Sequence, residues 1–412
     1  MTAQFPIDPA LVERYVLDLA RHGACAETGV CRTVYSPEWV AAQDQVAAWC
    51  AEAGLAVWRD AVGNVWGRLA GTDNSPAVVT GSHIDTQLPG GRYDGALGVI
   101  AGILALRALK ERHGAPRRSL DVVSFCQEEG SRFPRAGFWA SRALLGRIAP
   151  DEPDTLRAYG GETMREAMRD VGLDPARIPE ARRDDIAAYI ELHVEQGPVL
   201  EEAGLAVGVV DAITGSRTYN VTITGRSDHG GGCPMDLRHD PMAPAAELIT
   251  AALGVAREMG RPAVTTVGRL LVEPNYPAIV PERVTLAVNA RHPYAAGYAT
   301  LGERQEATLA AVRAAHPEVA IAWTARGGAP TPCAPEIVRL LEDAAHEQGI
   351  PALTMPSGGG HDCQVMATRF PAAMIFVQSR DGRSHTPAEY TAPEHAAAGI
   401  QLLAAALHRL AY

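Results

Sequence analysis

Residues 77–85 read Ala-Val-Val-Thr-Gly-Ser-His-Ile-Asp, a short apolar run that passes directly into a polar loop. The apolar part, residues 77–80, is typical of a buried β-strand. An apolar helix is expected next, over residues 97–110, and another apolar strand follows over residues 120–126. Buried strands that alternate with helices are typical of layered folds with a largely parallel sheet. We therefore predict an α/β fold from this stretch.

The same alternation is expected on both sides of this stretch. The expected helices are residues 11–20, 37–54, 335–348 and 393–410, and the expected strands are residues 187–192 and 372–377. A different pattern separates the two blocks, because residues 217–225 alternate with a period of two and are rich in β-branched side chains. That alternation predicts a half-exposed antiparallel strand.

The intervening region contains further strands and helices of its own. We expect strands over residues 263–271 and 283–290 and helices over residues 241–260 and 301–316. The Gly- and Pro-rich residues 327–332 end this region. We therefore predict a discontinuous catalytic domain over residues 1–211 and 330–412, interrupted by a smaller α+β domain over residues 212–329.

The composition excludes several classes of protein. The chain has 412 residues, of which 47% are hydrophobic and 21% charged, as in globular proteins of two or three domains. Its formal net charge of −11 argues against nucleic acid or an anionic membrane as a partner. No uncharged apolar run reaches the roughly 18 residues of a membrane span, and residues 1–6 do not resemble a signal peptide. The seven cysteines are scattered without a Cys-x-x-Cys motif, so we expect reduced thiols in a cytoplasmic protein.

Five potential metal ligands follow expected strands or precede expected helices, where α/β sheets form their ligand sites. They are His83, Asp94, Glu129, His193 and His385. Each has an ordinary alternative role: a hydrogen-bonded loop histidine, a helix N-cap for Asp94, or a solvated acidic turn for Glu129. Their recurrence at one kind of position favours a shared metal site.

Two further acids accompany these ligands. Glu128 adjoins Glu129 after an apolar strand, and burying both carboxylates is costly unless a cation compensates. A metal would hold one of them and leave the other as a general base. Asp85 lies two residues after His83, on the same face of an extended segment, where it can accept a hydrogen bond and fix the local geometry.

The series resembles the M20-type di-metal amidohydrolases. Within them it is similar to the branch of N-carbamoyl-L-amino acid hydrolases, β-ureidopropionases and allantoate amidohydrolases. The motifs that carry the resemblance run in family order across nearly the whole chain. They are Gly81-Ser82-His83-Ile84-Asp85, Asp94-Gly95, Glu128-Glu129-Gly130-Ser131-Arg132-Phe133, Leu192-His193-Val194-Glu195-Gln196-Gly197, Ser357-Gly358-Gly359-Gly360-His361-Asp362 and Ser384-His385-Thr386-Pro387.

The resemblance implies a role for each of these side chains. His83 and His193 would hold one divalent ion, Glu129 and His385 would hold a second, and Asp94 would bridge both. Glu128 would take a proton from the bridging water and return it to the leaving nitrogen, with Asp85 beside His83 outside the ligand set. This donor set suits Zn²⁺, Mn²⁺ or Co²⁺.

The inserted region carries a motif of the same branch over residues 225–240. The resemblance makes the insert a lid and dimerisation domain, and His229 an oxyanion stabiliser that serves the other subunit of a homodimer. Arg291 would clamp the substrate carboxylate. Without the motif, these two residues would be an exposed loop histidine and a surface arginine. The other substrate contacts are expected at Gln196, Asn275, Gly358 and Gly359.

Four residues of the insert depart from the pattern of the branch. They are Ser216, Gly230, Ala278 and Asn289, none of them a proposed ligand. The sequence thus indicates the reaction, hydrolysis of a ureido or amide C–N bond, more firmly than the substrate. We expect a small anionic substrate, an N-carbamoyl-L-amino acid or an allantoate-like acid. The alternatives are an N-acyl-L-amino acid deacylase of the same superfamily and a non-catalytic binding protein on the same scaffold.

Overall fold

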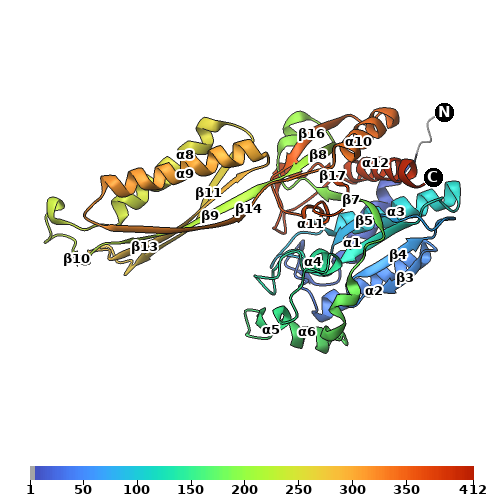
Figure 1. Ribbon diagram of the computed structural model, residues 1–412, viewed down its shortest axis with the longest axis horizontal. Helices are drawn as coiled ribbons and strands as arrows, with labels where there is room; N and C mark the ends of the chain where they lie inside the picture. The colour runs from blue at the N-terminus through green and yellow to red at the C-terminus, as the bar shows by residue number, and fades with distance from the viewer. Residues whose placement is uncertain (1–4) are drawn as a thin grey trace. The chain divides into compact units, whose positions relative to one another are not determined.

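A computed structural model describes residues 5–412, which form two compact units. The first unit comprises the chain up to Asp211 together with Cys333–Met355 and Gly359–Tyr412. The second unit comprises Ala212–Pro332 and Pro356–Gly358. Each unit has its own sheet and helices, labelled in Figure 1. None of the helices within residues 5–412 has the length and apolarity to cross a membrane.

The first unit is built on a mixed sheet in the strand order β8-β17-β7-β5-β6-β4-β3. The four central strands β17, β7, β5 and β6 are parallel, as expected for a layered α/β fold. Strands β8 and β4 pair antiparallel with their neighbours. The strands are β3 (Ala56–Arg59), β4 (Val65–Leu69), β5 (Ala77–His83), β6 (Leu120–Phe125), β7 (Ile186–Val194), β8 (Val207–Ile213) and β17 (Ala372–Val377), with β16 (Ala352–Ser357) paired to β8.

Helices pack against this sheet. α3 contacts β5, β6 and β7, and it also packs against α12 (Figure 1). Gly98 of α3 permits the close approach, since a Cβ there would lie 2.2 Å from the Leu192 carbonyl oxygen of β7. The helices are α1 (Pro9–Ala20), α2 (Pro37–Glu52), α3 (Ala96–His113), α4 (Trp139–Leu144), α5 (Glu152–Thr155), α6 (Met164–Asp170), α7 (Val199–Ala203), α10 (Pro335–Gln348), α11 (Asp362–Met366) and α12 (Pro393–Ala411).

Two central strands are longer than the sequence suggested. We expected strands over residues 77–80 and 187–192, with their histidines in the following loops. The structure continues β5 to His83 and β7 to Val194, so both His83 and His193 are strand residues. The physical reason is that neighbouring strands continue the pairing: His83 lies opposite Phe125, and His193 lies opposite Phe376. Both imidazoles are therefore held by a paired backbone instead of a loop.

The second unit contains a four-stranded antiparallel sheet in the order β11-β13-β9-β14. The side chains of β13 alternate between buried and less buried positions, and α8 and α9 cover the buried side (Figure 1). The elements are β9 (Gly215–Thr224), β10 (Asp228–His229), α8 (Met242–Met259), β11 (Val264–Glu273), β12 (Ile279–Val280), β13 (Arg283–His292), α9 (Ala295–Ala315), β14 (Ala320–Gly328) and β15 (Thr331–Pro332).

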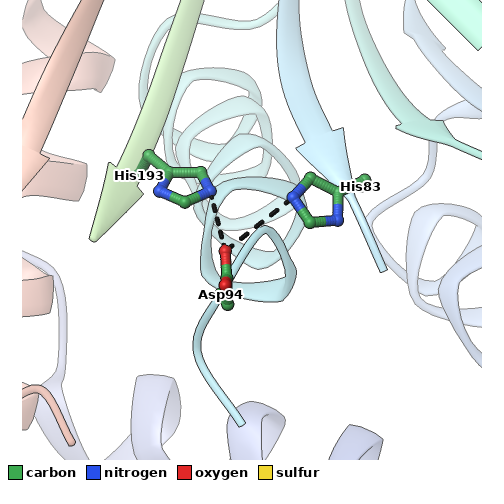
Figure 2. Close-up of side chains that lie close together, drawn as sticks. All are labelled: His83, Asp94 and His193. Atoms are coloured by element: carbon green, nitrogen blue, oxygen red, sulfur yellow. Dashed lines mark ion pairs between the residues drawn. The ribbon is translucent and has the colours of Figure 1, made fainter. Parts of the chain in front are cut away.

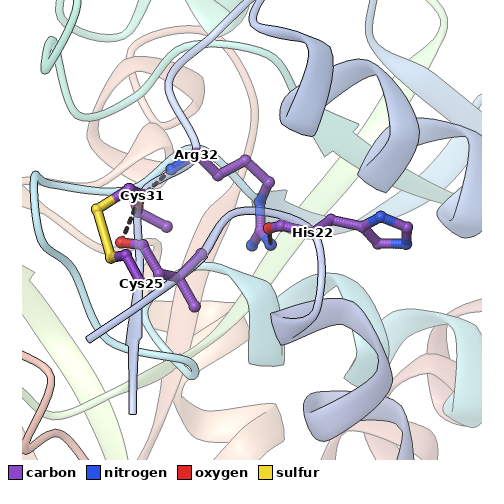
Figure 3. The surroundings of a disulfide bond; sticks show 6 residues. His22, Cys25, Cys31 and Arg32 are labelled. Atoms are coloured by element: carbon purple, nitrogen blue, oxygen red, sulfur yellow. Dashed lines mark hydrogen bonds between the residues drawn. A yellow bond between two sulfur atoms is a disulfide. The ribbon is translucent and has the colours of Figure 1, made fainter. Parts of the chain in front are cut away.

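A short hairpin near the N-terminus corrects the expectation that all cysteines are free thiols. Strands β1 (Ala24–Cys25) and β2 (Gly29–Val30) pair antiparallel, and a disulfide joins Cys25 to Cys31 (Figure 3). The hairpin brings the two Cα atoms to 6.0 Å, within the range that a disulfide spans. The other cysteines, Cys50, Cys126, Cys233, Cys333 and Cys363, are free.

Candidate metal centre

Three buried side chains of the first unit meet where β5 and β7 end. The Nε2 atom of His193 lies 3.2 Å from Oδ1 of Asp94, and Nε2 of His83 lies 3.9 Å from the same oxygen (Figure 2). Asp94 comes from the turn before α3, where Gly95 has a φ of 62°. A Cβ on Gly95 would lie 2.4 Å from the His83 ring. Glycine is therefore needed there, both for its backbone conformation and for space.

The remaining hydrogen bonds fix how both imidazoles face Asp94. Nδ1 of His193 lies 2.9 Å from the Val194 carbonyl oxygen, and Nδ1 of His83 lies 3.0 Å from the Asp85 carbonyl oxygen. A carbonyl only accepts, so each Nδ1 carries a proton and donates it. In the neutral rings each Nε2 then presents a lone pair toward the same carboxylate. A cation bound between the two Nε2 atoms and Asp94 would be coordinated by these lone pairs. Metal-ligating histidines commonly donate their other ring N–H to a carbonyl in the same way.

A second group shares Asp94 through its other oxygen. Nε2 of His385 lies 3.1 Å from Oδ2 of Asp94 and 3.5 Å from Oε1 of Glu129. Oε2 of Glu129 accepts a hydrogen bond of 2.6 Å from Gln87, whereas its buried Oε1 accepts none from any residue in the described range 5–412. This oxygen could bind a cation, because a buried carboxylate oxygen without a hydrogen bond is costly. The five predicted ligands thus form two adjoining groups that fit two ions.

The electrostatics of the two groups also favour a bound cation. Burial alone would raise the pKa of Asp94, but the imidazoles of His193 and His385 outweigh burial and hold that pKa well below its usual range. Burial, together with the charge of Asp94, raises the pKa of Glu129 to about 7. The hydrogen bond to Asp94 raises the pKa of His385 to about 9. Without a metal, the cluster therefore retains protons where cations would otherwise lie.

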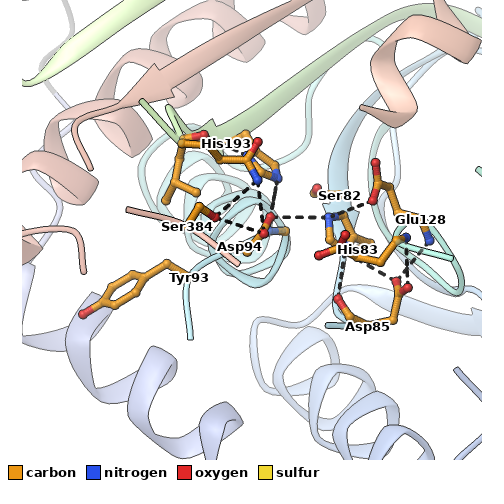
Figure 4. Close-up of polar contacts among 12 residues, drawn as sticks. Ser82, His83, Asp85, Tyr93, Asp94, Glu128, His193 and Ser384 are labelled. Carbon is orange, nitrogen blue, oxygen red and sulfur yellow. Dashed lines mark hydrogen bonds and ion pairs between the residues drawn. The ribbon is translucent and has the colours of Figure 1, made fainter. Parts of the chain in front are cut away.

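Glu128 lies beside the group that contains His83 and belongs to neither of the two groups. Its Oε2 lies 3.8 Å from Nε2 of His83, and burial raises the pKa of its carboxyl well above its usual range. The carboxylate of Asp85 accepts the backbone N–H groups of Glu128 and Glu129, each at 3.1 Å (Figure 4). Asp85 thus aligns the turn that carries Glu128 and Glu129, a function that spacing alone did not reveal.

Several residues of this site were not predicted. Gln87 bonds to Glu129, and Ser384 and Glu389 belong to the loop of His385. Gln196, expected to contact substrate, donates to Oδ2 of Asp94 at 3.1 Å. A Cβ on Gly359 would lie 2.9 Å from Oε1 of Gln196, which puts that predicted glycine beside the same amide. The acid in Thr-Pro-Ala-Glu was the one available sequence signal for Glu389.

A third group of potential ligands is less suited to a metal. It comprises Glu191, His193 and His361, all buried. Both oxygens of Glu191 already accept hydrogen bonds, one from Ser82 at 2.7 Å and the other from the backbone N–H of Cys363 at 2.9 Å. Glu191 is therefore satisfied by the protein, unlike Glu129.

The residues predicted to bind substrate from the insert lie in the second unit. His229 is exposed, and its Nδ1 accepts from the backbone N–H groups of Gly231 and Gly232 at 3.1 and 2.9 Å. An accepting Nδ1 places the proton of the neutral ring on Nε2. His229 therefore presents an N–H donor, the group that an oxyanion requires. Asn275 is exposed between β11 and β12 with a φ of 57°.

Arg291, on β13, has uncharged hydrogen-bond partners. Its Nε donates to Oδ1 of Asn289 at 2.7 Å, and its Nη1 donates to the carbonyl of Gly358 at 3.0 Å. Asn289 in turn donates to Thr218 at 2.8 Å, and Ser216 lies opposite Arg291 on β9. Asn289 is an uncharged amide, so it gives Arg291 no counter-charge and leaves the positive charge of the arginine available to an anion.

Comparison with known proteins identifies relatives over almost the full chain. Residues 79–409 match the family described as peptidase family M20/M25/M40. An allantoate amidohydrolase of Bacillus subtilis is 38% identical over 97% of both chains. An N-carbamoyl-L-amino acid amidohydrolase of Geobacillus stearothermophilus is 38% identical over 94% of this chain and 95% of its own. The crystal structure of a hydantoinase/carbamoylase family amidase from Burkholderia multivorans superposes with a TM-score of 0.91 at 31% identity, covering 98% of both chains.

Proposed function

Because the chain belongs to peptidase family M20/M25/M40, we propose that it is a di-metal amidohydrolase of an N-carbamoyl-L-amino acid or a related ureido acid such as allantoate. The observation that carries this proposal is the arrangement around Asp94. Each of its two oxygens faces a separate set of ligand atoms, and Glu129 contributes a buried oxygen with no hydrogen bond from any of the described residues.

The assignment of ligands follows the two groups. His83 and His193 would hold one divalent ion, Glu129 and His385 the other, and Asp94 both. Zn²⁺, Mn²⁺ or Co²⁺ suits this set of imidazoles and carboxylates. When bound, such ions polarise a carbonyl oxygen and lower the pKa of a water molecule.

Glu128 supplies the proton transfer in this proposal. It lies 3.8 Å from Nε2 of His83 and belongs to neither ligand group, and Asp85 holds its backbone in place. The carboxylate of Glu128 takes a proton from the attacking water and delivers it to the departing nitrogen. A carboxyl whose pKa is raised by burial suits both halves of this task, because it holds a proton more readily than an ordinary glutamic acid and can then return it.

The second unit supplies recognition. The Nε2–H of His229 stabilises the developing oxyanion, and Arg291 binds the substrate carboxylate. We infer that the enzyme is a homodimer in which His229 serves the site of the other copy. The exposure of His229 supports this inference, as do the exposed apolar side chains of Leu270 and Leu271 on the edge strand β11.

A metal-reconstituted activity screen tests the reaction. The purified chain is loaded with Zn²⁺, Mn²⁺ or Co²⁺ and offered N-carbamoyl-L-amino acids, allantoate and N-acetyl-L-amino acids. Release of ammonia from a ureido acid is the expected result. Release of a carboxylic acid from the acetylated substrates alone would instead identify a deacylase.

Matched variants test the mechanism and the assembly. Glu128→Gln should bind two ions per chain but lose turnover, and a fully active Glu128→Gln enzyme would refute the assigned base. Co-expression of Glu128→Gln with His229→Ala should yield mixed dimers that contain one intact site. Activity that reappears only in the mixed dimers supports action across the dimer, whereas its absence in a mixture proven to exchange subunits contradicts it.

A further inference from the structure

Glu389 joins the turn of Asp94 to the loop of His385. It lies four residues after His385 and is 4% exposed. Its Oε1 accepts the backbone N–H groups of Tyr93 and Asp94 at 2.8 and 2.9 Å. Its Oε2 accepts the hydroxyl of Ser384 at 2.6 Å. Figure 4 shows Ser384 next to the carboxylate of Asp94. One buried carboxylate thus fixes both segments that face the second ion.

The fold leaves space for this carboxylate. A Cβ on Gly91 would lie 2.2 Å from Oε1 of Glu389, so any other residue at position 91 would displace the acid. Glu389 is outside all three groups of potential metal ligands. Burying the carboxyl group of Glu389 beside Asp94 is costly. The hydrogen bonds that Glu389 accepts from the backbone and from Ser384 offset this cost.

The hydroxyl of Ser384 has two possible acceptors but only one proton. Its Oγ lies 2.6 Å from Oε2 of Glu389 and 3.2 Å from Oδ2 of Asp94. The contact of 2.6 Å to Glu389 is the shorter of the two and therefore the stronger hydrogen bond. The proton therefore points to Glu389, and Oδ2 of Asp94 keeps a lone pair for the side of the cluster that contains His385.

We propose that Glu389 is a positioning residue that directs the Ser384 proton away from Asp94 and so keeps Oδ2 of Asp94 available to the second metal ion. This inference rests on the proposed two-metal site. In an E389Q variant, the amide oxygen still accepts from the backbone of Tyr93 and Asp94. Its amide NH₂, however, donates to Ser384, which turns the hydroxyl proton toward Oδ2 of Asp94.

The test measures Zn²⁺ affinity and stoichiometry of the full chain by competition with a chelating dye. For E389Q we expect about tenfold weaker binding of the second ion, within the ~10–100-fold range known for residues that support metal ligands, and unchanged binding of the first. Adding S384A should restore most of the lost affinity, because the misdirected hydroxyl is then gone. A merely structural role for Glu389 predicts a further loss in the double variant.

E195Q is a matched control for general destabilisation. Glu195 is also a buried acid that accepts two backbone N–H groups, those of Val199 and Leu200, at 2.6 and 3.0 Å. This variant should lower the melting temperature of the metal-free protein without changing Zn²⁺ affinity. An equal loss of affinity in E195Q and E389Q would overturn the proposal.

The outcomes separate this inference from the proposed function. A wild-type chain that binds only one Zn²⁺ would overturn the two-metal site and the role of Glu389 with it. A wild type that binds two ions and an E389Q variant with unchanged affinity for both would overturn the role of Glu389 alone.

Discussion

The polar residues around Asp94 and those around Arg291 are held in opposite ways. Asp94, His83 and His193 are buried, and each faces another titratable group of the first unit. Arg291 is only partly buried, His229 is exposed, and their hydrogen-bond partners are neutral amides and carbonyls of the second unit. In the first region, the titratable groups around Asp94 therefore interact with one another, whereas in the second region Arg291 and His229 offer a positive charge and an N–H donor to a ligand.

This difference bears on the four residues that depart from the pattern expected of the branch. Ser216, Gly230, Ala278 and Asn289 all belong to the second unit. A change within the network around Asp94 would leave a buried charge without its partner, which costs several kcal/mol. A change beside Arg291 alters only what an anion meets there. We therefore expect the reaction to be determined by the first region and the choice of substrate by the second.

The largest effect should come from Glu128→Gln. Removing the proton acceptor should lower kcat by about 10³-fold or more, since general acid–base catalysis contributes ~10²–10⁴-fold. Metal stoichiometry should remain at the wild-type value, because Glu128 is outside both ligand groups. Steady-state kinetics with metal analysis provides the check. Loss of an ion in this variant would place Glu128 among the ligands, and the separation between metal ligands and proton acceptor in the first region would be wrong.

The next effect should come from the second region. His229→Ala removes a donor aimed at a transient oxyanion, so kcat should fall by about 10²-fold with little change in KM. His229→Gln, which keeps an N–H donor, should recover part of the rate. A variant whose KM rises while kcat stays constant would show that His229 binds the ground state instead.

Sequence reasoning identified the candidate ligands that the structure brings together, but not the residues that hold them in place. His83, Asp94, Glu129, His193 and His385 were found because apolar strands and helices repeatedly adjoin metal-capable side chains. The strand ends were placed too early, since polar residues inside a paired strand interrupt the apolar pattern.

The supporting residues were missed for a related reason. Glu389 lies in a loop without periodicity, and its partners are a backbone turn nearly 300 residues earlier in the chain, at Tyr93 and Asp94. The Cys25–Cys31 pair was missed because an isolated spacing carries no information about a hairpin. Such contacts depend on the tertiary fold, which a local pattern does not describe.

A smaller effect is expected for Arg291→Lys. Lysine keeps the charge but loses the planar pair of donors, so KM for an anionic ureido acid should rise about tenfold while kcat changes little. In the matched variant Asn289→Asp, a carboxylate replaces the amide whose Oδ1 lies 2.7 Å from Nε of Arg291. This carboxylate should compete with the substrate carboxylate for Arg291 and so also raise KM. Initial-rate kinetics distinguishes the two parameters. A wild-type KM in both variants would remove Arg291 from substrate binding.

The smallest effect concerns the pH dependence of the metal-free chain. The pKa of Glu129 is raised to about 7 and that of His385 to about 9, so the folded state binds more protons than the unfolded state from about pH 5 to pH 9. The stabilising charge of His385 is fully present below its unfolded pKa and is lost as pH rises through about 9. Ionisation of Glu129 adds repulsion in the same direction. Stability should therefore fall between pH 6 and pH 9, and bound Zn²⁺ should flatten this fall by replacing the protons.

Hydrogen exchange can locate that effect. Corrected for the intrinsic pH dependence of exchange, peptides from β5 and β7 in the metal-free chain should lose protection as pH rises, whereas peptides from β9 and β13 should change less. The reason is that the proton-retaining cluster belongs to the first unit alone. Equal loss of protection in both sets would mean that the two units unfold as one, and the contrast between a buried network and an independent recognition surface would not extend to their stability.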